Sequence, residues 1–214
     1  MFEFVNSLKA LLYVPARESW RAITNHGMNL VLSKSNLNMT METLELEKLD
    51  VQSPEQRKIK VNTGIKESAR ENIASGLKKL LADSYCLMLM TQNYHWNVQG
   101  MNFRNIHLMT EEHYNDLFGA IDQVAERIRA LGFLAPGTMK EFNDITSINI
   151  PNAELSDQEM IADLLVGHET VARTAREALD QAGDAKDEVT VDLLTERMEY
   201  HEKTAWMLRS MLER

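Results

Sequence analysis

The chain has 214 residues and a formal net charge of −9, a size that fits one domain with a single hydrophobic core. It has one cysteine, so an internal disulfide and a cysteine metal cluster are excluded, which suits a reducing compartment. No apolar run approaches the roughly 20 residues that a membrane span requires. The acidic balance argues against tight nucleic-acid binding by the body of the protein.

The beginning of the chain differs in composition from the rest. Residues 1–40 lack a secretory pattern, because Lys9 interrupts the apolar region and no positive cluster precedes it. Residues 41–64 are charged and contain proline, as in an arm or linker. We therefore expect a poorly ordered extension over residues 1–64 and one folded domain over residues 65–214.

Helical patterns fill that domain, because long stretches favour good helix formers and repeat apolar residues every three or four positions. The four long helices are expected over about 65–97, 103–131, 156–182 and 187–212. Gly132 and Gly183 are expected to end the second and third of them, and Ser156 with Glu159 forms a capping box.

The connections between these helices indicate the topology. Two are short, and the one after Gly132 is long, with room for a short helix near Met139–Phe142. This pattern suits an all-α, ferritin-like four-helix bundle. We expect Phe103 to begin the core stripe of the second helix and the Cys86 thiol to be buried in the core.

Metal-ligand residue types recur at regular steps on the second helix. His107 with Glu111, and Asp122 with Glu126, form two pairs spaced four residues apart, so that each pair can grip one ion. At 100° per residue, all four fall within a sector roughly 100° wide, beside the core stripe. Phe118 shares this sector, which is therefore not purely solvated.

The two pairs cannot share an ion within one straight helix, since His107 and Asp122 are roughly 22 Å apart along its axis. A second copy of the helix, antiparallel about a two-fold axis, would place the first pair of one chain against the second pair of the other. Two-fold contacts of this kind are the commonest in oligomers. The spacing therefore suggests a site between subunits.

His95 extends this set, because a turn over 97–100 can bring it back over the start of the second helix. Two imidazoles and three carboxylates suit iron, with manganese or zinc as alternatives. The competing interpretation is that these charges simply form a solvated helix face. The sequence has neither an HExxH zinc motif nor the Glu-x-x-His pairs of within-chain di-iron bundles.

The sequence words YHWNVQG, IDQVAERIRALG and APGTMKEF, with DLLTERMEYHEKTAWMLRS near the C-terminus, resemble the Dps family, the mini-ferritins first known as DNA-binding proteins of starved cells. The likeness covers roughly residues 60–214. It implies that the metal and catalytic residues are those of the family's ferroxidase centre, which lies between two-fold-related chains: His95, His107, Glu111, Asp122 and Glu126. Family members usually have Asp where this chain has Glu111, which is one methylene longer.

The resemblance implies a hollow homododecamer in the bacterial cytoplasm. It would oxidise ferrous iron at two ions per site, preferably with hydrogen peroxide, store a ferric mineral and use no organic cofactor. It also implies that Trp96 intercepts stray oxidising equivalents, although an ordinary packing role is the alternative. Asp180, Glu188 and Asp192 match the acidic iron-entry pore, with favourable charge at a helix start as the rival explanation.

Two other functions compete with iron storage. Some family members compact DNA with basic tails, which would make this a nucleoid-associated protein, but residues 1–64 carry a net charge of only +1. Phosphate neutralisation needs several cations, so we expect weak DNA binding at most. A metal-free bundle used as an interaction scaffold is the third possibility. Family members commonly begin near Met39 or Met41, and we expect residues 1–40 to be dispensable.

Overall fold

The computed structural model describes residues 19–23, 29–33, 61–151 and 154–213. The chain divides into two compact units, 1–57 and 58–214. The expectation of a poorly ordered extension concerns mainly residues outside the described part of the chain, and it stays a prediction.

Two strands, β1 (Ser19–Ile23) and β2 (Asn29–Ser33), pair in the first unit. They are antiparallel, with Ser19 opposite Ser33 and Ile23 opposite Asn29. This hairpin was not predicted from the sequence. The strands contain Trp, Ile, Val and Leu, residue types that sheets favour or tolerate.

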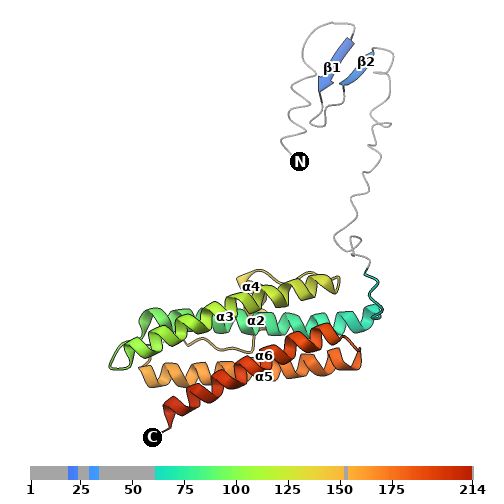
Figure 1. Ribbon diagram of the computed structural model, residues 1–214. Helices are drawn as coiled ribbons and strands as arrows, with labels where there is room; N and C mark the ends of the chain where they lie inside the picture. Colours follow the sequence, from blue (N-terminus) through green and yellow to red (C-terminus); the bar gives the residue numbers. More distant parts are fainter. Residues whose placement is uncertain (1–18, 24–28, 34–60, 152–153, 214) are drawn as a thin grey trace. The chain divides into compact units, whose positions relative to one another are not determined.

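The second unit is the expected four-helix bundle with a short extra helix in its long crossover. Its elements are α2 (Glu67–Asn97), α3 (Phe103–Ala130), α4 (Met139–Ile145), α5 (Asp157–Asp184) and α6 (Glu188–Leu212). Figure 1 shows α2 and α3 as one antiparallel hairpin and α5 and α6 as another, with the crossover running between them. The all-α, ferritin-like prediction for this unit is confirmed.

Aliphatic side chains from all four long helices fill the bundle. Those that are most completely buried include Leu77, Leu87, Ile106, Leu117, Ile161, Leu164, Leu194 and Leu208. Cys86 is buried as predicted, and burial raises the pKa of its thiol. The prediction for Phe103 was wrong, because this side chain is 45% exposed in the first turn of α3 and lies outside the core.

The helix ends show which capping signals the sequence carries reliably. Gly132 has φ 97°, as expected for a residue that follows a helix, and Ser156 with Glu159 forms the predicted capping box. The prediction that Gly183 ends α5 was wrong, because the helix continues to Asp184 and the left-handed residue is Lys186, with φ 56°. The turn therefore lies three residues later than the glycine.

A buried carboxylate ties the crossover to the bundle. Asp83 of α2 accepts hydrogen bonds from the Thr146 hydroxyl at 2.9 Å, the Ser147 backbone N–H at 2.5 Å and the Thr174 hydroxyl at 2.8 Å. It is fully buried, and these three donors come from the crossover and from α5. Asp83 therefore fixes where the chain passes from the first hairpin to the second.

Among the described helices, none is both long enough and apolar enough to cross a lipid bilayer.

Candidate metal centre

His95 and His107 lie face to face where α2 ends and α3 begins. Their ring centroids are 3.8 Å apart and their planes differ by 15°. His95 Nδ1 donates to the His107 backbone carbonyl at 2.8 Å, and His107 Nδ1 donates to the His95 carbonyl at 2.9 Å. The short connection at Asn97–Gly100 makes this reciprocal pairing possible, as the sequence predicted for His95.

These two hydrogen bonds fix the tautomer of both rings. A carbonyl oxygen can only accept, so each Nδ1 must carry a proton, and in a neutral imidazole this leaves the lone pair on Nε2. A hydrogen bond from the opposite ring nitrogen is the usual way in which proteins orient a metal-binding histidine. The two imidazoles are therefore prepared to act as a pair of Nε2 ligands.

Aromatic side chains hold the pair in place from two directions. Phe103 stacks on His107 with ring centroids 5.1 Å apart, and Tyr114 meets His95 edge-on at 5.3 Å. The half-exposed position of Phe103 thus has a local cause, since its ring covers an imidazole. His95 is almost completely buried, whereas His107 is partly accessible.

The three carboxylates lie farther along the exposed side of α3. Glu111 is one turn beyond His107, and Asp122 and Glu126 follow roughly 22 Å and 28 Å from His107 along the helix axis. All three side chains are exposed. Among the described residues of this one chain, no three His, Cys, Asp or Glu side chains are grouped closely enough to hold a metal ion. One chain brings the histidines together but separates them from Asp122 and Glu126.

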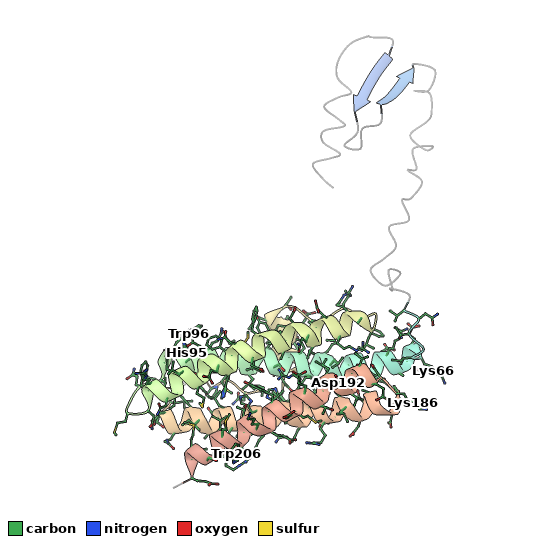
Figure 2. The ribbon with its side chains drawn as sticks, viewed as in Figure 1. Lys66, His95, Trp96, Lys186, Asp192 and Trp206 are labelled. Atoms are coloured by element: carbon green, nitrogen blue, oxygen red, sulfur yellow. The ribbon has the colours of Figure 1, made fainter. Side chains whose placement is uncertain are left out.

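Trp96 follows His95 directly in the last turn of α2. Its side chain is 64% exposed in the single chain, so it does not pack in the core of the bundle. Figure 2 shows His95 and Trp96 toward one end of the bundle, whereas Lys186 and Asp192 lie toward the other.

The acidic residues around the α5–α6 junction fall into two groups. Asp187 is buried and caps α6 by accepting from the Thr190 backbone N–H at 3.2 Å, and Arg127 of α3 pairs with its carboxylate at 2.6 Å. Burial acts to raise the pKa of Asp187, but the hydrogen bonds from Arg127 and Thr190 outweigh it and hold this pKa below its usual value. Asp187 is therefore structural.

The residues predicted to form a pore behave differently from Asp187. Asp180, Glu188 and Asp192 are all exposed, and Glu188 and Asp192 lie one turn apart on α6. The attraction between a carboxylate and a helix start can apply to Glu188 in the first turn. It does not reach Asp180, which is near the C-terminal end of α5, or Asp192, which is in the second turn of α6.

Three further histidines were not assigned by sequence reasoning. His113 of α3, His168 of α5 and His201 of α6 are all buried within the bundle. The sequence could have indicated that they are buried, because each lies close to the core-facing stripe of its own helix. That they meet one another depends on the packing of three helices, which no single helical pattern shows.

Comparisons with known proteins match residues 74–214 to the ferritin-like domain family. An uncharacterised low temperature-induced protein of Nostoc is 40% identical over 156 residues, which cover 72% of this chain and 87% of that protein. DNA protection during starvation protein 2 of Bacillus anthracis is 35% identical over 136 residues, covering 64% of this chain and 93% of that one.

The fold is similar to that of solved Dps structures. One example is a Dps protein from Vibrio cholerae, described as a member of a broad superfamily of ferritin-like diiron-carboxylate proteins. It has a TM-score of 0.69 and 29% sequence identity, and the match covers 72% of this chain and 98% of that one.

Proposed function

The chain belongs to the Dps family of ferritin-like proteins, and we propose that it is a ferroxidase. It oxidises ferrous iron, preferentially with hydrogen peroxide, and stores the ferric product as a mineral inside a hollow homododecamer. Iron is the substrate and the stored cargo. The proposed location is the cytoplasm.

The pairing of His95 with His107 supports this proposal most directly. Each ring donates its Nδ1 proton to the carbonyl of the other residue, which leaves both Nε2 atoms available as ligands. Two imidazoles together with carboxylates suit ferrous and ferric iron.

A second copy of the chain completes the site in this proposal. Asp122 and Glu126 lie on the same face of α3 as His107, so an antiparallel α3 of another subunit would bring its carboxylate pair to the histidines. Phe118 lies between the two pairs on this face and is 70% exposed. An exposed aromatic side chain beside unpaired ligands is expected at a surface that another subunit covers.

Glu111 is the member of the set that departs from the family pattern. It stands one turn from His107 and its side chain is exposed, so its longer carboxylate can extend toward an ion held at the Nε2 atoms. We propose that it serves as a ligand in place of the usual aspartate.

The proposed reaction is balanced without an added reductant. Two ferrous ions each lose one electron, and hydrogen peroxide accepts both electrons with two protons to give two water molecules. Because both electrons are delivered at one site, no hydroxyl radical is released. Any oxidising equivalent that leaves the site meets Trp96, whose exposed indole directly follows His95 in the chain.

A subunit-mixing experiment tests the proposed site. His107→Ala and Asp122→Ala subunits are each expected to form shells with strongly reduced peroxide-driven iron oxidation. When they are mixed before assembly, each mixed two-fold interface contains one site lacking two ligands and one complete site. Random mixing then restores about a quarter of the wild-type sites, which is measured as the rate of ferric absorbance after a peroxide pulse on anaerobically loaded protein.

A mixture of His95→Ala and His107→Ala subunits is the matched control. Both residues belong to the same half of every proposed site, so no arrangement of these subunits creates a complete site and activity stays low. Recovery in the control mixture, or no recovery in the test mixture, would show that the ligands do not meet across a two-fold interface. Wild-type rates in purified His107→Ala shells would contradict the ligand assignment itself.

DNA compaction is retained as the second function, because relatives such as the Bacillus anthracis protein are named for DNA protection. The net charge of +1 over residues 1–64 limits the phosphate contacts available to each chain. Twelve extensions on one particle can still act together through avidity. Gel retardation of DNA at increasing salt separates the alternatives, since we expect weak retention that is lost at physiological ionic strength.

A further inference from the structure

Three imidazoles that take no part in the proposed iron site meet inside the bundle. His168 Nδ1 of α5 lies 2.9 Å from His201 Nδ1 of α6. The ring of His113 from α3 stands edge-on to His168, with centroids 5.4 Å apart. All three side chains are buried, so this cluster links both helical hairpins at the centre of the core.

The cluster is incompletely hydrogen-bonded. Across the described residues, every buried side-chain nitrogen without a hydrogen-bond partner belongs to this region: His113 Nδ1, His168 Nε2 and Arg197 Nε. Buried polar atoms are normally satisfied, and a group of unsatisfied ones indicates a special role or a place that other molecules enter. This concentration of unsatisfied atoms distinguishes the cluster from the fully bonded carboxylate of Asp83.

The hydrogen bond between His168 and His201 depends on their protonation. Two neutral rings can share one Nδ1 proton, with one nitrogen donating and the other accepting. A first added proton places a positive charge in the core. A second leaves protons on both facing Nδ1 atoms, so the hydrogen bond is lost and two like charges stand with ring centroids 5.0 Å apart.

Within the described part of the chain, no free carboxylate is seen to face the pair and balance such a charge. Asp116 of α3 is already paired with Arg197 of α6 at 3.0 Å, and the Arg197 guanidinium is itself a nearby positive charge. His113 and Tyr200 are the other titratable groups against His168. The negative charge of Glu112 of α3 contributes to raising the pKa of Tyr200, but the Glu112 side chain is exposed.

The side of the pair that faces α2 is apolar. A Cβ placed on Gly167, the neighbour of His168, would meet Leu87 Cδ1 at 2.7 Å and Met90 Cε at 3.0 Å. The titratable groups of α2 near this level are Asp83 and Cys86. Asp83 accepts hydrogen bonds from Thr146, Ser147 and Thr174, and the Cys86 thiol is hydrogen-bonded to Thr146. Charge on the imidazoles therefore receives no compensation from α2.

Burial accordingly lowers the pKa of His168 well below its usual value, and it lowers the pKa of His201 to about 3. Repulsion from the neighbouring His113 also lowers both pKa values, and the positive charge of Arg197 further lowers that of His201. An unfolded chain takes up protons on these residues near pH 6.5, whereas the folded bundle does not. The stabilisation is therefore fully present above pH 6.5 and is lost progressively as the pH falls toward the folded-state pKa values.

We propose that the His168–His201 pair is an acid-sensitive contact, through which proton uptake separates the α5–α6 hairpin from α3. His113 stands edge-on to His168 and belongs to the other hairpin, so α3 can move away from the pair without breaking the hydrogen bonds within any helix. Neither His168 nor His201 is among the proposed iron ligands.

Chemical unfolding of the full-length protein tests the proposal, at one fixed protein concentration between pH 7.5 and pH 5. The wild type is compared with the His168→Gln/His201→Gln double variant, which cannot take up these protons. With two histidines titrating only in the unfolded state, the unfolding equilibrium constant should rise roughly 900-fold more in the wild type than in the double variant over this range. Equal pH dependence in the two proteins would overturn the proposal.

His26→Asn is the matched control, because it removes one histidine outside the 58–214 unit and should leave the wild-type pH dependence unchanged. Amide hydrogen exchange of the wild type provides a second test if the double variant does not fold. After correction for intrinsic rates, peptides spanning the middle of α3, α5 and α6 should lose protection between pH 7 and pH 5. The end of α2 at His95, which pairs with His107, should keep its protection. Unchanged protection in those three helices would also overturn the proposal.

Discussion

Lys186 occupies a backbone position that favours glycine. Its φ of 56° lies in the left-handed region, and its N–H donates to the Gly183 carbonyl at 3.0 Å while the Asp187 N–H donates to that of Ala182 at 2.9 Å. This is the Schellman arrangement, in which a left-handed residue ends the helix. Asp187 also pairs with Arg127, so contacts on the far side of the turn hold Lys186 in this conformation.

We predict that Lys186→Gly stabilises the protein. Glycine removes the steric penalty of a left-handed side chain, so the free energy of unfolding should rise by about 0.5–1 kcal/mol. Gly183→Ala should add a similar amount, because Gly183 lies within α5 and a Cβ there meets nothing within 4 Å. Urea unfolding at neutral pH measures both changes.

Lys203→Gly is the control, since it makes the same lysine-to-glycine change at an exposed position inside α6. Here glycine should lower the free energy of unfolding by about 1 kcal/mol. If Lys186→Gly destabilised the protein as much as the control does, the lysine side chain would contribute more to the free energy of unfolding than the relief of its left-handed backbone.

The same junction shows what a sequence can reveal at the scale of single residues. Ser156 with Glu159 was predictable because a capping box needs only residues that are adjacent in the chain. Gly183 was misleading because the left-handed residue is Lys186, and the Asp187 that follows it pairs with Arg127 of α3, a contact that the local sequence does not show. Phe103 was misassigned for a related reason, since it follows an apolar pattern but stacks on His107 at the bundle surface.

At the scale of elements, Asp83 determines how the crossover joins the two hairpins. Its three donors are the Thr146 hydroxyl, the Ser147 N–H and the Thr174 hydroxyl. Phe142 of α4 supplements this link by stacking on Tyr85 with ring centroids 4.5 Å apart. The polar contact specifies the path of the crossover and the apolar contact covers it.

We predict that Asp83→Ala lowers the free energy of unfolding by about 3–4 kcal/mol, because it leaves buried donors without an acceptor. Asp83→Asn should cost less, since the amide oxygen can still accept from Ser147. Asp144→Ala is the control, as Asp144 is an exposed member of a surface ion pair with Lys140. Chemical unfolding of the three variants should give this order, and a loss below about 1 kcal/mol for Asp83→Ala would contradict the role assigned to it.

The helices themselves could be predicted because each carries its own periodicity, and the His95–His107 pairing followed from a short connection. Tertiary clusters could not be predicted in this way. His113, His168 and His201 come from three helices, and each alone resembles any polar residue near a core stripe. Their burial depends on the rotation of α3, α5 and α6 relative to one another, which a single helical pattern does not fix.

At the scale of the whole molecule, the acidic residues at the α5–α6 junction are predicted to guide iron into the shell. Asp180→Asn, Glu188→Gln and Asp192→Asn together remove negative charge from exposed positions without touching the buried Asp187. We expect the shell to assemble and iron uptake to slow several-fold at low ionic strength, because the field that concentrates cations is lost. The difference from wild type should shrink at high salt.

The control for this experiment removes the same amount of charge elsewhere, through Asp144→Asn, Glu154→Gln and Glu199→Gln. These residues are exposed and lie away from the junction of the last two helices. We expect uptake close to that of the wild type. If both triple variants slow uptake equally, the effect reflects net charge and the three junction residues do not form an entry path.

The extension before the bundle is the remaining part of the whole molecule. The described core is built from side chains between Arg70 and Leu208, and the ferritin-like match begins at residue 74. β1 and β2 pair with each other, so their ladder can be removed as a unit. All five proposed ligands also lie within the bundle.

We therefore predict that a chain beginning at Met41 folds, assembles and oxidises iron like the full-length protein. Native mass spectrometry and ferric absorbance after a peroxide pulse measure the two properties. A chain beginning at Ile73 is the control, because it loses Arg70, whose guanidinium donates to the Leu131 carbonyl at 2.5 Å and so joins the start of α2 to the end of α3. It should unfold more readily. Loss of assembly or of iron oxidation in the Met41 chain would show that the extension takes part in the shell, since the contacts within the bundle are all retained.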